Sequence, residues 1–421
     1  MMKNTLILLL LSFLFSCQTA EKGPQPLPVE TLVKDLSEKL ITATADEVIL
    51  LPEGKFEFQR PLSLDAVPNV TIKGMGKGKT ILSFKGQIEG AEGLIIKNVE
   101  GLTLVGFTVA DTKGDAIKVQ ACKNVTFRDM ETTWTGGPKT TNGGYGLYPV
   151  SCTNVLMENC EASYASDAGI YVGQSTNVVV RNNYAHHNVA GIEIENTRNA
   201  DVYNNKAENN SGGLLIFDMP DLPQANGYKI KVHDNVIENN NHPNFAAAGT
   251  VVATLPPGSG LTIMAHREIE AYNNTIRGHH TVAISMVSWL FTGQPFKSEE
   301  YDPFCAKIYV HDNILENNQG AMDMTTDFGK ILTAVAQGQT VGIAIDGIFN
   351  PEKYGKDGEV VCFKNNGEVS FLNLNAGMGG TPNEIMKNKS TDISPFDCSL
   401  ETMDISGHDA WLAQKGSVKG E

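Results

Sequence analysis

The chain carries a repeat of about 22 residues, and this period constrains its fold more than any other feature. In each repeat a small residue precedes an apolar residue, and apolar and other residues then alternate over a short stretch. The pattern occurs at Ala116-Ile117, Gly146-Leu147, Gly169-Ile170, Gly191-Ile192, Gly213-Leu214, Gly260-Leu261, Ala283-Ile284 and Ala321-Met322. We interpret the longer steps as one unit plus an insertion. A period of this length predicts stacked supersecondary units, and the alternation predicts that the units are made of strands.

Two further columns support three strands per unit. A second strand begins at Val125, Val155, Val178, Ala200, Ile230, Ile269 and Ile308, and each start is followed four residues later by Asp or Asn. We interpret these Asp and Asn residues as structural, because they tolerate left-handed turns and can stack as ladders of side-chain amides. A third strand is indicated by small residues at Thr132, Ala162, Ala185 and Ala207. The prediction is an all-β fold, a single-stranded right-handed parallel β-helix.

The repeat also carries a family resemblance. The unit Asn-Val-x-x-x-Asn-Asn followed by Gly-Ile-x-Ile, at 177–194, resembles the repeats of the pectate-lyase-like superfold. The stretches VILLPEGKF at 48–56 and NVTIKGMG at 69–76 are similar to the beginnings of those domains. The resemblance covers roughly residues 45–330. It implies the β-helix fold, and the superfold includes polysaccharide lyases, epimerases and many uncharacterised periplasmic proteins. The fold hosts unrelated functions, so the resemblance does not by itself name an activity.

The two ends of the chain differ from the repeat. Residues 1–16 read as a signal peptide, and Leu14-Phe15-Ser16-Cys17 resembles a bacterial lipobox with Cys17 as the lipidated residue. Residues 17–30 are then a lipid-anchored linker, which predicts an outer-membrane lipoprotein of the bacterial cell envelope. Apolar spacing at 31–41 predicts a helix that caps the core. We assign 31–330 to the β-helix domain with this cap, and 331–421 to the last coil and a C-terminal cover.

The net charge and the cysteine positions limit the binding partners, disulfides and metal sites that the chain can have. The formal net charge of −15 argues against nucleic-acid binding, and it is unfavourable for a polyanionic glycan unless lysines or a divalent cation offset it. Cys122 and Cys152 share a repeat position, where either a disulfide or a ladder of small residues is expected. Cys362 and Cys398 could form a disulfide in the C-terminal part. No cysteine spacing matches a zinc site.

Four insertions predict a groove. They lie around 135–143 and 242–258 on one edge of the Gly-Ile sheet, and around 218–227 and 289–304 on the other edge. Loops on a rigid scaffold commonly carry function, so the outer face of this sheet is the expected floor. Its first column is predicted to hold Lys118, Tyr148, Tyr171, Glu193, Leu215, Thr262, Ser285 and Asp323. Its second column is predicted to hold Gln120, Val150, Gly173, Glu195, Phe217 and Met264.

From these positions we predict the site residues. The candidate catalytic residues are Lys139, Tyr145, Tyr148 and Tyr171, and the candidate substrate-binding residues are Lys118, Glu193, Phe217 and Trp289. Glu193, Glu195 and Asp218 are candidate oxygen ligands for calcium. The alternatives are a purely structural tyrosine pair and a solvated acidic surface. His187 and His279 are predicted to lie in surface turns, too far apart to share an ion.

Two functions of different classes follow. The first is a lyase or epimerase that acts on an acidic glycan, since removal of a proton next to a carboxylate needs a base and a neutralising group. The second is a non-catalytic β-helix that binds a polysaccharide or assists envelope assembly. A hydrolase would need opposed carboxylates. The sequence shows no Asp-Asp pair and no Gly-His-Gly, and Asp302-Pro303 is followed by Phe304 rather than the histidine of alginate epimerases.

Overall fold

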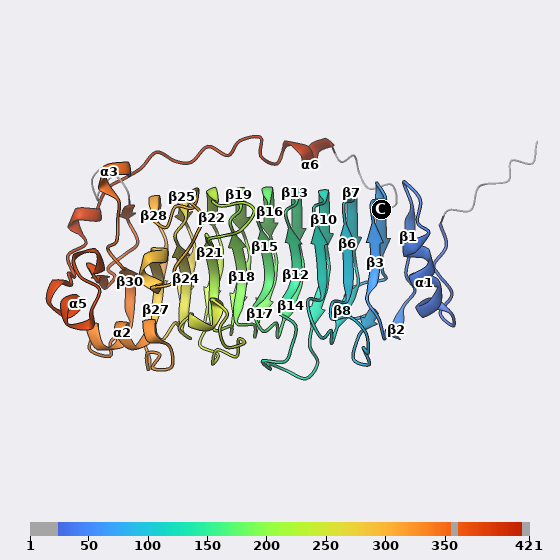
Figure 1. The fold of residues 1–421 in the computed structure, drawn as a ribbon, viewed down its shortest axis with the longest axis horizontal. Coiled ribbons are helices and arrows are strands. Elements are labelled where there is room, and N and C mark those ends of the chain that lie inside the picture. Colours follow the sequence, from blue (N-terminus) through green and yellow to red (C-terminus); the bar gives the residue numbers. More distant parts are fainter. Residues whose placement is uncertain (1–23, 355–360, 415–421) are drawn as a thin grey trace, which may run out of the picture.

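The predicted strand rows form three parallel sheets that wind into a right-handed β-helix (Figure 1). The computed structural model describes residues 24–354 and 361–414, so the expected signal peptide and Cys17 lie outside the described residues. Sheet A contains β1 (Val48–Leu50), β4 (Val70–Lys73), β7 (Glu100–Val105), β10 (Lys123–Arg128), β13 (Thr153–Glu158), β16 (Thr176–Arg181), β19 (Arg198–Tyr203), β22 (Tyr228–His233), β25 (Arg267–Tyr272), β28 (Ala306–His311) and β31 (Val361–Lys364).

The other two sheets complete each coil. Sheet B contains β2 (Gly54–Glu57), β5 (Thr80–Ser83), β8 (Thr108–Ala110), β11 (Glu131–Thr133), β14 (Glu161–Ser163), β17 (Tyr184–His186), β20 (Lys206–Glu208), β23 (Val236–Glu238), β26 (Thr275–Arg277) and β29 (Ile314–Glu316). Sheet C, the Gly-Ile sheet, contains β3 (Leu62–Asp65), β6 (Leu94–Lys97), β9 (Ile117–Gln120), β12 (Tyr145–Val150), β15 (Ala168–Gly173), β18 (Ala190–Glu195), β21 (Gly212–Phe217), β24 (Ser259–Met264), β27 (Val282–Val287), β30 (Val341–Ile345) and β32 (Phe371–Asn373).

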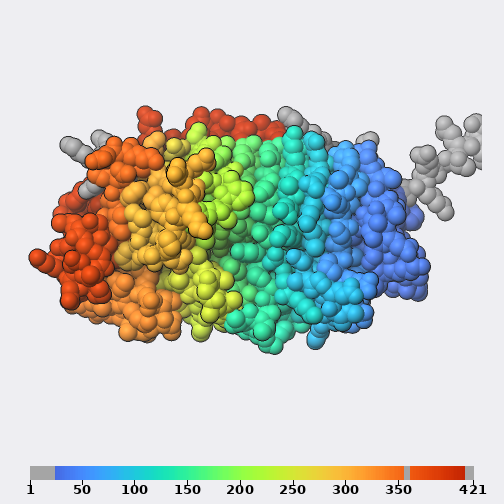
Figure 2. Space-filling model, viewed as in Figure 1, coloured from blue at the N-terminus to red at the C-terminus, as the bar shows by residue number. Residues whose placement is uncertain are grey.

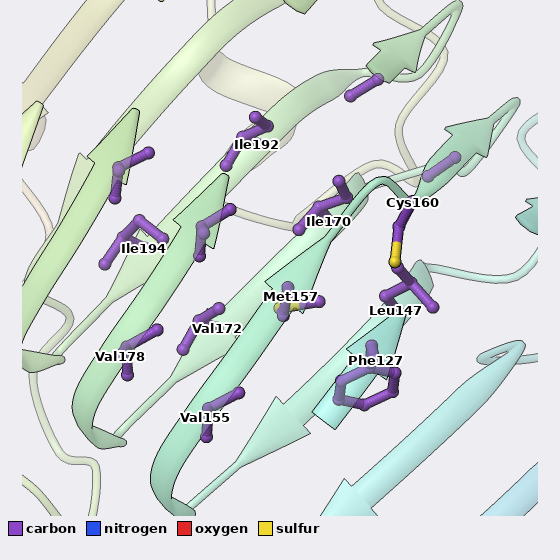
Figure 3. Close-up of a cluster of buried hydrophobic side chains, with 14 of the residues drawn as sticks. Phe127, Leu147, Val155, Met157, Cys160, Ile170, Val172, Val178, Ile192 and Ile194 are labelled. Atoms are coloured by element: carbon purple, nitrogen blue, oxygen red, sulfur yellow. The ribbon is translucent and has the colours of Figure 1, made fainter. Parts of the chain in front are cut away.

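The register of sheet C agrees with the repeat over most of its length. Ile170 pairs with Ile192, and Ile192 pairs with Leu214 in the next coil. These side chains are fully buried and stack with those of the other sheets along the solenoid interior (Figure 3). The assignment of Met322 to this column was wrong, because β30 supplies the next strand and Ile343 pairs with Ile284. The intervening segment forms α2 (Asp327–Val335), and Asp323 bonds the backbone just before this helix instead of facing the groove.

The predicted turn column is present, and a second, buried ladder lies beside it. Asn182 and Asn204 of this column have left-handed backbone (φ 56° and 54°). Asn154 and Asn177, in the turns just before the sheet A strands, also have left-handed backbone (φ 61° and 58°), and their side chains are linked by a 3.2 Å hydrogen bond. The buried ladder directly follows the column of Asn182 and Asn204, at Asn183, Asn205, Asn235, Asn274, Asn313 and Asn366. A third column contains Asn188, Asn210, Asn240, His279 and Asn318. The surface-turn prediction for His279 was therefore wrong, since its side chain is fully buried in this ladder.

A helix closes the N-terminal end of the core, as the apolar spacing predicted. This helix, α1, spans Leu32–Ile41, and it buries Leu32, Leu36 and Leu40 against the first coil. Val33 and Ile41 also belong to the apolar spacing of 31–41, but they are 41% and 77% exposed. Among the described residues, no helix has both the length and the apolar character needed to cross a membrane.

The C-terminal part completes the coil stack and then returns along its outside. It contains α3 (Pro351–Tyr354), α5 (Pro382–Asn388), α6 (Ala410–Gln414) and short 3-10 turns at Ala376–Met378 and Ser394–Phe396. The Cys362–Cys398 disulfide ties the returning segment to β31. The segment then runs along the strands of sheet A (Figure 1), where its atoms lie along the upper rim of the molecule (Figure 2), and it packs Trp411 on Leu156 and Val179. Cys122 and Cys152 are free and stack without a disulfide.

Candidate functional site

Three tyrosines form a compact cluster on the outer face of sheet C. Tyr145 and Tyr148 come from β12, and Tyr171 comes from β15 in the next coil. Their ring centroids lie 4.6 Å apart for Tyr145–Tyr148, 4.4 Å for Tyr145–Tyr171 and 4.9 Å for Tyr148–Tyr171. Tyr171 is buried, whereas Tyr145 and Tyr148 are half-buried. Tyr145 and Tyr148 therefore keep part of their surface accessible to solvent.

Four carboxyl groups surround the tyrosines. Glu193 and Glu195 point outward from β18, while Asp115 and Asp167 lie just before β9 and β15. The Tyr171 hydroxyl donates to Glu195 Oε1 at 2.7 Å. Glu193 Oε2 and Asp167 Oδ1 are buried and have no hydrogen-bond partner among the described residues. Buried polar atoms are normally paired, so these two oxygens mark a place where a ligand or water is expected.

Burial shifts the protonation of this cluster toward neutral forms. It raises the pKa of Asp115 to about 6. It also raises the pKa of Asp167 to about 7, with the Glu195 charge adding to the effect. The pKa of Glu195 rises to about 7 for the same reason, against the Tyr171 hydrogen bond. The pKa of Glu193 lies well above its ordinary value, because its carboxyl is buried and close to Asp167. Burial also raises the pKa of all three tyrosines, which keeps them protonated at neutral pH.

Lys118 is the cation nearest to the rings in the contacts of the described residues. It lies on β9, one strand before Tyr148, and its Nζ is 4.9 Å from the Tyr148 ring centroid. The same Nζ is 4.0 Å from Asp115 Oδ2. The lysine side chain remains 25% exposed. Lys118 can therefore approach a ligand that lies over Tyr148.

A pocket of about 560 Å³ continues the same face toward the C-terminal end. Its floor is formed by outward residues of β21, β24 and β27, including Phe217, Met264 and Val287. Its walls come from the loop 244–256, from the turn at Trp289–Thr292 and from the start of α2. Two of the four predicted insertions thus do enclose a hollow on the predicted floor. The hollow lies further along the solenoid than the tyrosines.

Some of the predicted residues lie elsewhere. Lys139 is exposed in the loop between β11 and β12, and no ion pair links it to the tyrosines or the carboxyl groups among the described contacts. Trp289 is only 2% exposed, and its indole nitrogen donates to Gln294 O at 3.0 Å inside its own loop. In this structure Trp289 supports the loop and offers no ring face to a ligand.

Asp218 is also engaged in contacts that hold loops together. Its carboxylate accepts from the Gly227 backbone N–H at 2.9 Å, and Arg267 Nη2 lies 3.4 Å away. The Tyr301 hydroxyl donates to the Asp218 carbonyl at 2.7 Å. These contacts join the insertions 218–227 and 289–304. The structure does not bring Asp218 together with Glu193 and Glu195 as an ion site, and the described residues contain no cluster of three or more His, Cys, Asp or Glu side chains suited to a metal.

The sequence interpretation missed Asp115 and Asp167. Asp115 lies two residues before Ile117, whereas Asp167 lies three residues before Ile170, and the coil of β12 separates β9 from β15. The two residues therefore occupy different positions of the repeat, and no periodic signal in the sequence pointed to them. Asp115 is held at the cluster because its Oδ1 accepts from the Tyr145 backbone N–H at 3.3 Å.

Comparison with known proteins supports the fold. The model of the family described as "Right handed beta helix region" matches residues 139–293. Among solved structures, the Azotobacter vinelandii mannuronan C-5 epimerase AlgE4 A-module superposes with a TM-score of 0.51 at 14% identity, covering 79% of this chain and 89% of that one. What they share is the right-handed parallel β-helix. At this identity the likeness says nothing about activity.

A curated relative matches a smaller part. The chain is 27% identical over 167 residues to the pre-neck appendage protein of Bacillus phage phi29. The match covers 33% of this chain and 19% of the phage protein. The N-terminal fragment of bacteriophage phi29 gene product 12 superposes at a TM-score of 0.44 and 15% identity, covering 76% of this chain and 62% of that chain. A likeness at this level carries no argument about function.

Proposed function

We propose that the chain binds a glycan along the outer face of sheet C and acts on it by general acid–base chemistry at the tyrosine–carboxyl cluster. The observation that carries the proposal is the buried, unpartnered Glu193 oxygen beside three tyrosines and three further carboxyl groups. An apolar pocket next to convergent polar groups with perturbed pKa values is typical of a reaction site.

The pKa shifts indicate which side chains can transfer protons and which can only donate hydrogen bonds. Asp167 and Glu195, each with a pKa of about 7, can both accept and return a proton at neutral pH. The tyrosines have raised pKa values, so they act as hydrogen-bond donors to sugar oxygens rather than as bases. We therefore transfer the role of base from the predicted Lys139 and tyrosines to a carboxylate. One protonated and one ionised carboxyl group are also what glycoside hydrolysis requires.

A lyase or epimerase that acts on a uronate glycan is the second candidate, and Lys118 favours it. Its ammonium group near Tyr148 could neutralise one uronate carboxylate. Four carboxyl groups beside a single lysine repel an anionic sugar, however, unless the carboxyl groups are protonated or a cation bridges them. Calcium, for which the sequence offers candidate ligands, would serve as such a bridge. The charge balance thus favours an uncharged or cationic sugar at the cluster.

A polymer panel tests the proposal. The protein is incubated with neutral, amino-sugar and uronate polysaccharides, the last with and without calcium. New reducing ends indicate hydrolysis, unsaturated-uronate absorbance indicates a lyase, and a changed NMR spectrum of an intact polymer indicates an epimerase. Glu195→Gln should lower turnover at least about 100-fold, while Glu316→Gln, on exposed β29 of sheet B, should not change it. Binding without turnover would favour the non-catalytic alternative, and a fully active Glu195→Gln protein would refute the proposed site.

We also propose that the protein is a lipoprotein of the bacterial outer membrane, anchored through Cys17. The support is the lipobox-like Leu14-Phe15-Ser16-Cys17 after an apolar run. Cys17→Ser should leave an uncleaved precursor or release the mature chain from membranes. Processed Cys17→Ser protein that still sediments with membranes would contradict the anchor.

A further inference from the structure

The pocket at the C-terminal end of sheet C has a chemistry different from that of the cluster. Phe217, Met264 and Val287 form its floor, and Leu255 and Phe328 contribute to its walls. The two hydroxyls on the floor bond to each other, since Ser285 Oγ lies 3.0 Å from Thr262 Oγ1. The pocket is thus lined mainly by apolar groups.

The pocket contains little charge. Its lining includes one ionisable side chain, that of Asp327 at the start of α2. This carboxylate is 94% exposed and pairs with Lys330 at 2.9 Å, so it belongs to the rim. An apolar ligand group that enters the pocket therefore meets no buried charge. It would exchange contact with water for contact with Phe, Met, Val and Leu side chains.

The pocket and the cluster are continuous. Glu195 pairs with Phe217 across neighbouring strands, and Glu193 pairs with Leu215. Neighbouring strands lie about 4.8 Å apart, so the apolar floor begins one strand from the carboxyl groups. Tyr171, Phe217 and Met264 also belong to one buried hydrophobic cluster. One ligand can thus reach both regions.

We propose that the pocket binds an alkyl or acyl chain carried by the sugar whose polar part lies at the tyrosine–carboxyl cluster. This inference rests on the proposed function, which it deepens by naming an acylated or alkylated glycan as the substrate class. The pocket volume of about 560 Å³ lies within the range of small-molecule sites. Three separate segments of the chain wall it in, as expected for a ligand group rather than for a flat protein partner.

Two probes that differ only in their chain test the proposal. Octyl β-glucoside, used below its micelle concentration, should bind at least about 10-fold more tightly than methyl β-glucoside in calorimetry, because each buried methylene adds favourable transfer free energy. Ser285→Glu places a charge on the pocket floor and should weaken octyl glucoside binding more than about 10-fold. Ser63→Glu is the matched control, since Ser63 is exposed in the same outward column of sheet C at its other end. It should leave octyl glucoside binding unchanged.

A second variant tests the pocket in case Ser285→Glu destabilises the fold. If Ser285→Glu lowers the melting temperature strongly, Phe328→Ala removes an apolar wall and should weaken octyl glucoside binding several-fold. The proposal would be overturned by equal affinity for the two glucosides or by no binding of either. It would also be overturned if octyl glucoside binding were unchanged in both pocket variants. Polymer turnover measured on the same proteins separates the two claims. Octyl binding with no turnover of any glycan would refute the proposed function alone, and turnover without chain selectivity would refute the pocket alone.

Discussion

Neutralising Glu195 should stabilise the fold at alkaline pH, which is the reverse of the usual effect of removing a hydrogen-bonded buried side chain. Burial raises the pKa of Glu195 from its ordinary 4.5 to about 7. A carboxyl group whose pKa is raised on folding holds a proton that the unfolded chain releases. Its contribution to stability is therefore fully present below about pH 4.5 and is lost as the pH rises through about 7. Glu195→Gln imitates the protonated form and keeps an oxygen that can accept from Tyr171.

The expected change in the free energy of unfolding follows from the pKa shift of Glu195. A difference of about 2.5 pKa units at 1.36 kcal/mol per unit gives about 3 kcal/mol of added stability for Glu195→Gln at pH 8. At pH 5 the folded wild type is still protonated at this position, so the gain falls below about 1 kcal/mol. Removing the Glu195 charge also lowers the pKa of Asp167, because that charge is one of the causes of its shift. Asp167 should then ionise at lower pH in the variant.

Urea unfolding followed by circular dichroism, at several pH values between 5 and 8, measures this effect. The quantity to compare is the difference in free energy of unfolding between variant and wild type, since other groups titrate in both proteins. Glu316→Gln serves as the control, because Glu316 is exposed on sheet B. A Glu195→Gln protein that is less stable than wild type at pH 8, or equally changed at pH 5 and pH 8, would refute the description of the cluster as buried and proton-rich.

Three further predictions test the fold. Asn210→Ala removes hydrogen bonds to Asn188 and Asn240 from the buried ladder, and we expect chemical denaturation to show a loss of about 2–5 kcal/mol in the free energy of unfolding. Asn177→Gly, in a turn, should cost less than about 1 kcal/mol. Equal losses for the two variants would contradict the ladder. Ile192→Asp puts an unpaired charge in the core and should cost more than about 4 kcal/mol, so a melting curve like that of wild type would contradict the register. Cys398→Ala should speed hydrogen exchange in 399–412 without changing sheet C, and unaltered exchange would show that the disulfide does not hold this segment.

The sequence predicted what is periodic. Inward apolar columns such as Ile170–Ile192–Leu214 fix the strand register, because a one-residue slip would expose the whole set. The buried ladder was visible as well, since Asn183 and Asn205 directly follow the turn residues that we had singled out. We had assigned the turn role correctly and overlooked the residue beside it.

The non-periodic parts were less predictable. A loop has no repeat to show which side of a residue is buried, so the burial of Trp289 within its own turn could not be deduced. The insertion that holds α2 shifted the next coil from Met322 to Ile343, because helices interrupt the strand period. Glu193 was placed on the correct face but is only 3% exposed, between the buried Tyr171 and Leu215 of the two neighbouring strands. Outward position in a solenoid therefore does not guarantee exposure.

The most direct test of the central claim is a crystal structure of the Glu195→Gln variant with an oligosaccharide of whichever polymer the wild type binds. Our account predicts sugar density on the outer face of sheet C, over Tyr148 and within hydrogen-bonding distance of Asp167 or residue 195. Any apolar substituent should extend past Phe217 into the pocket. Density confined to sheet A or sheet B, with the face around Tyr148 empty, would contradict it.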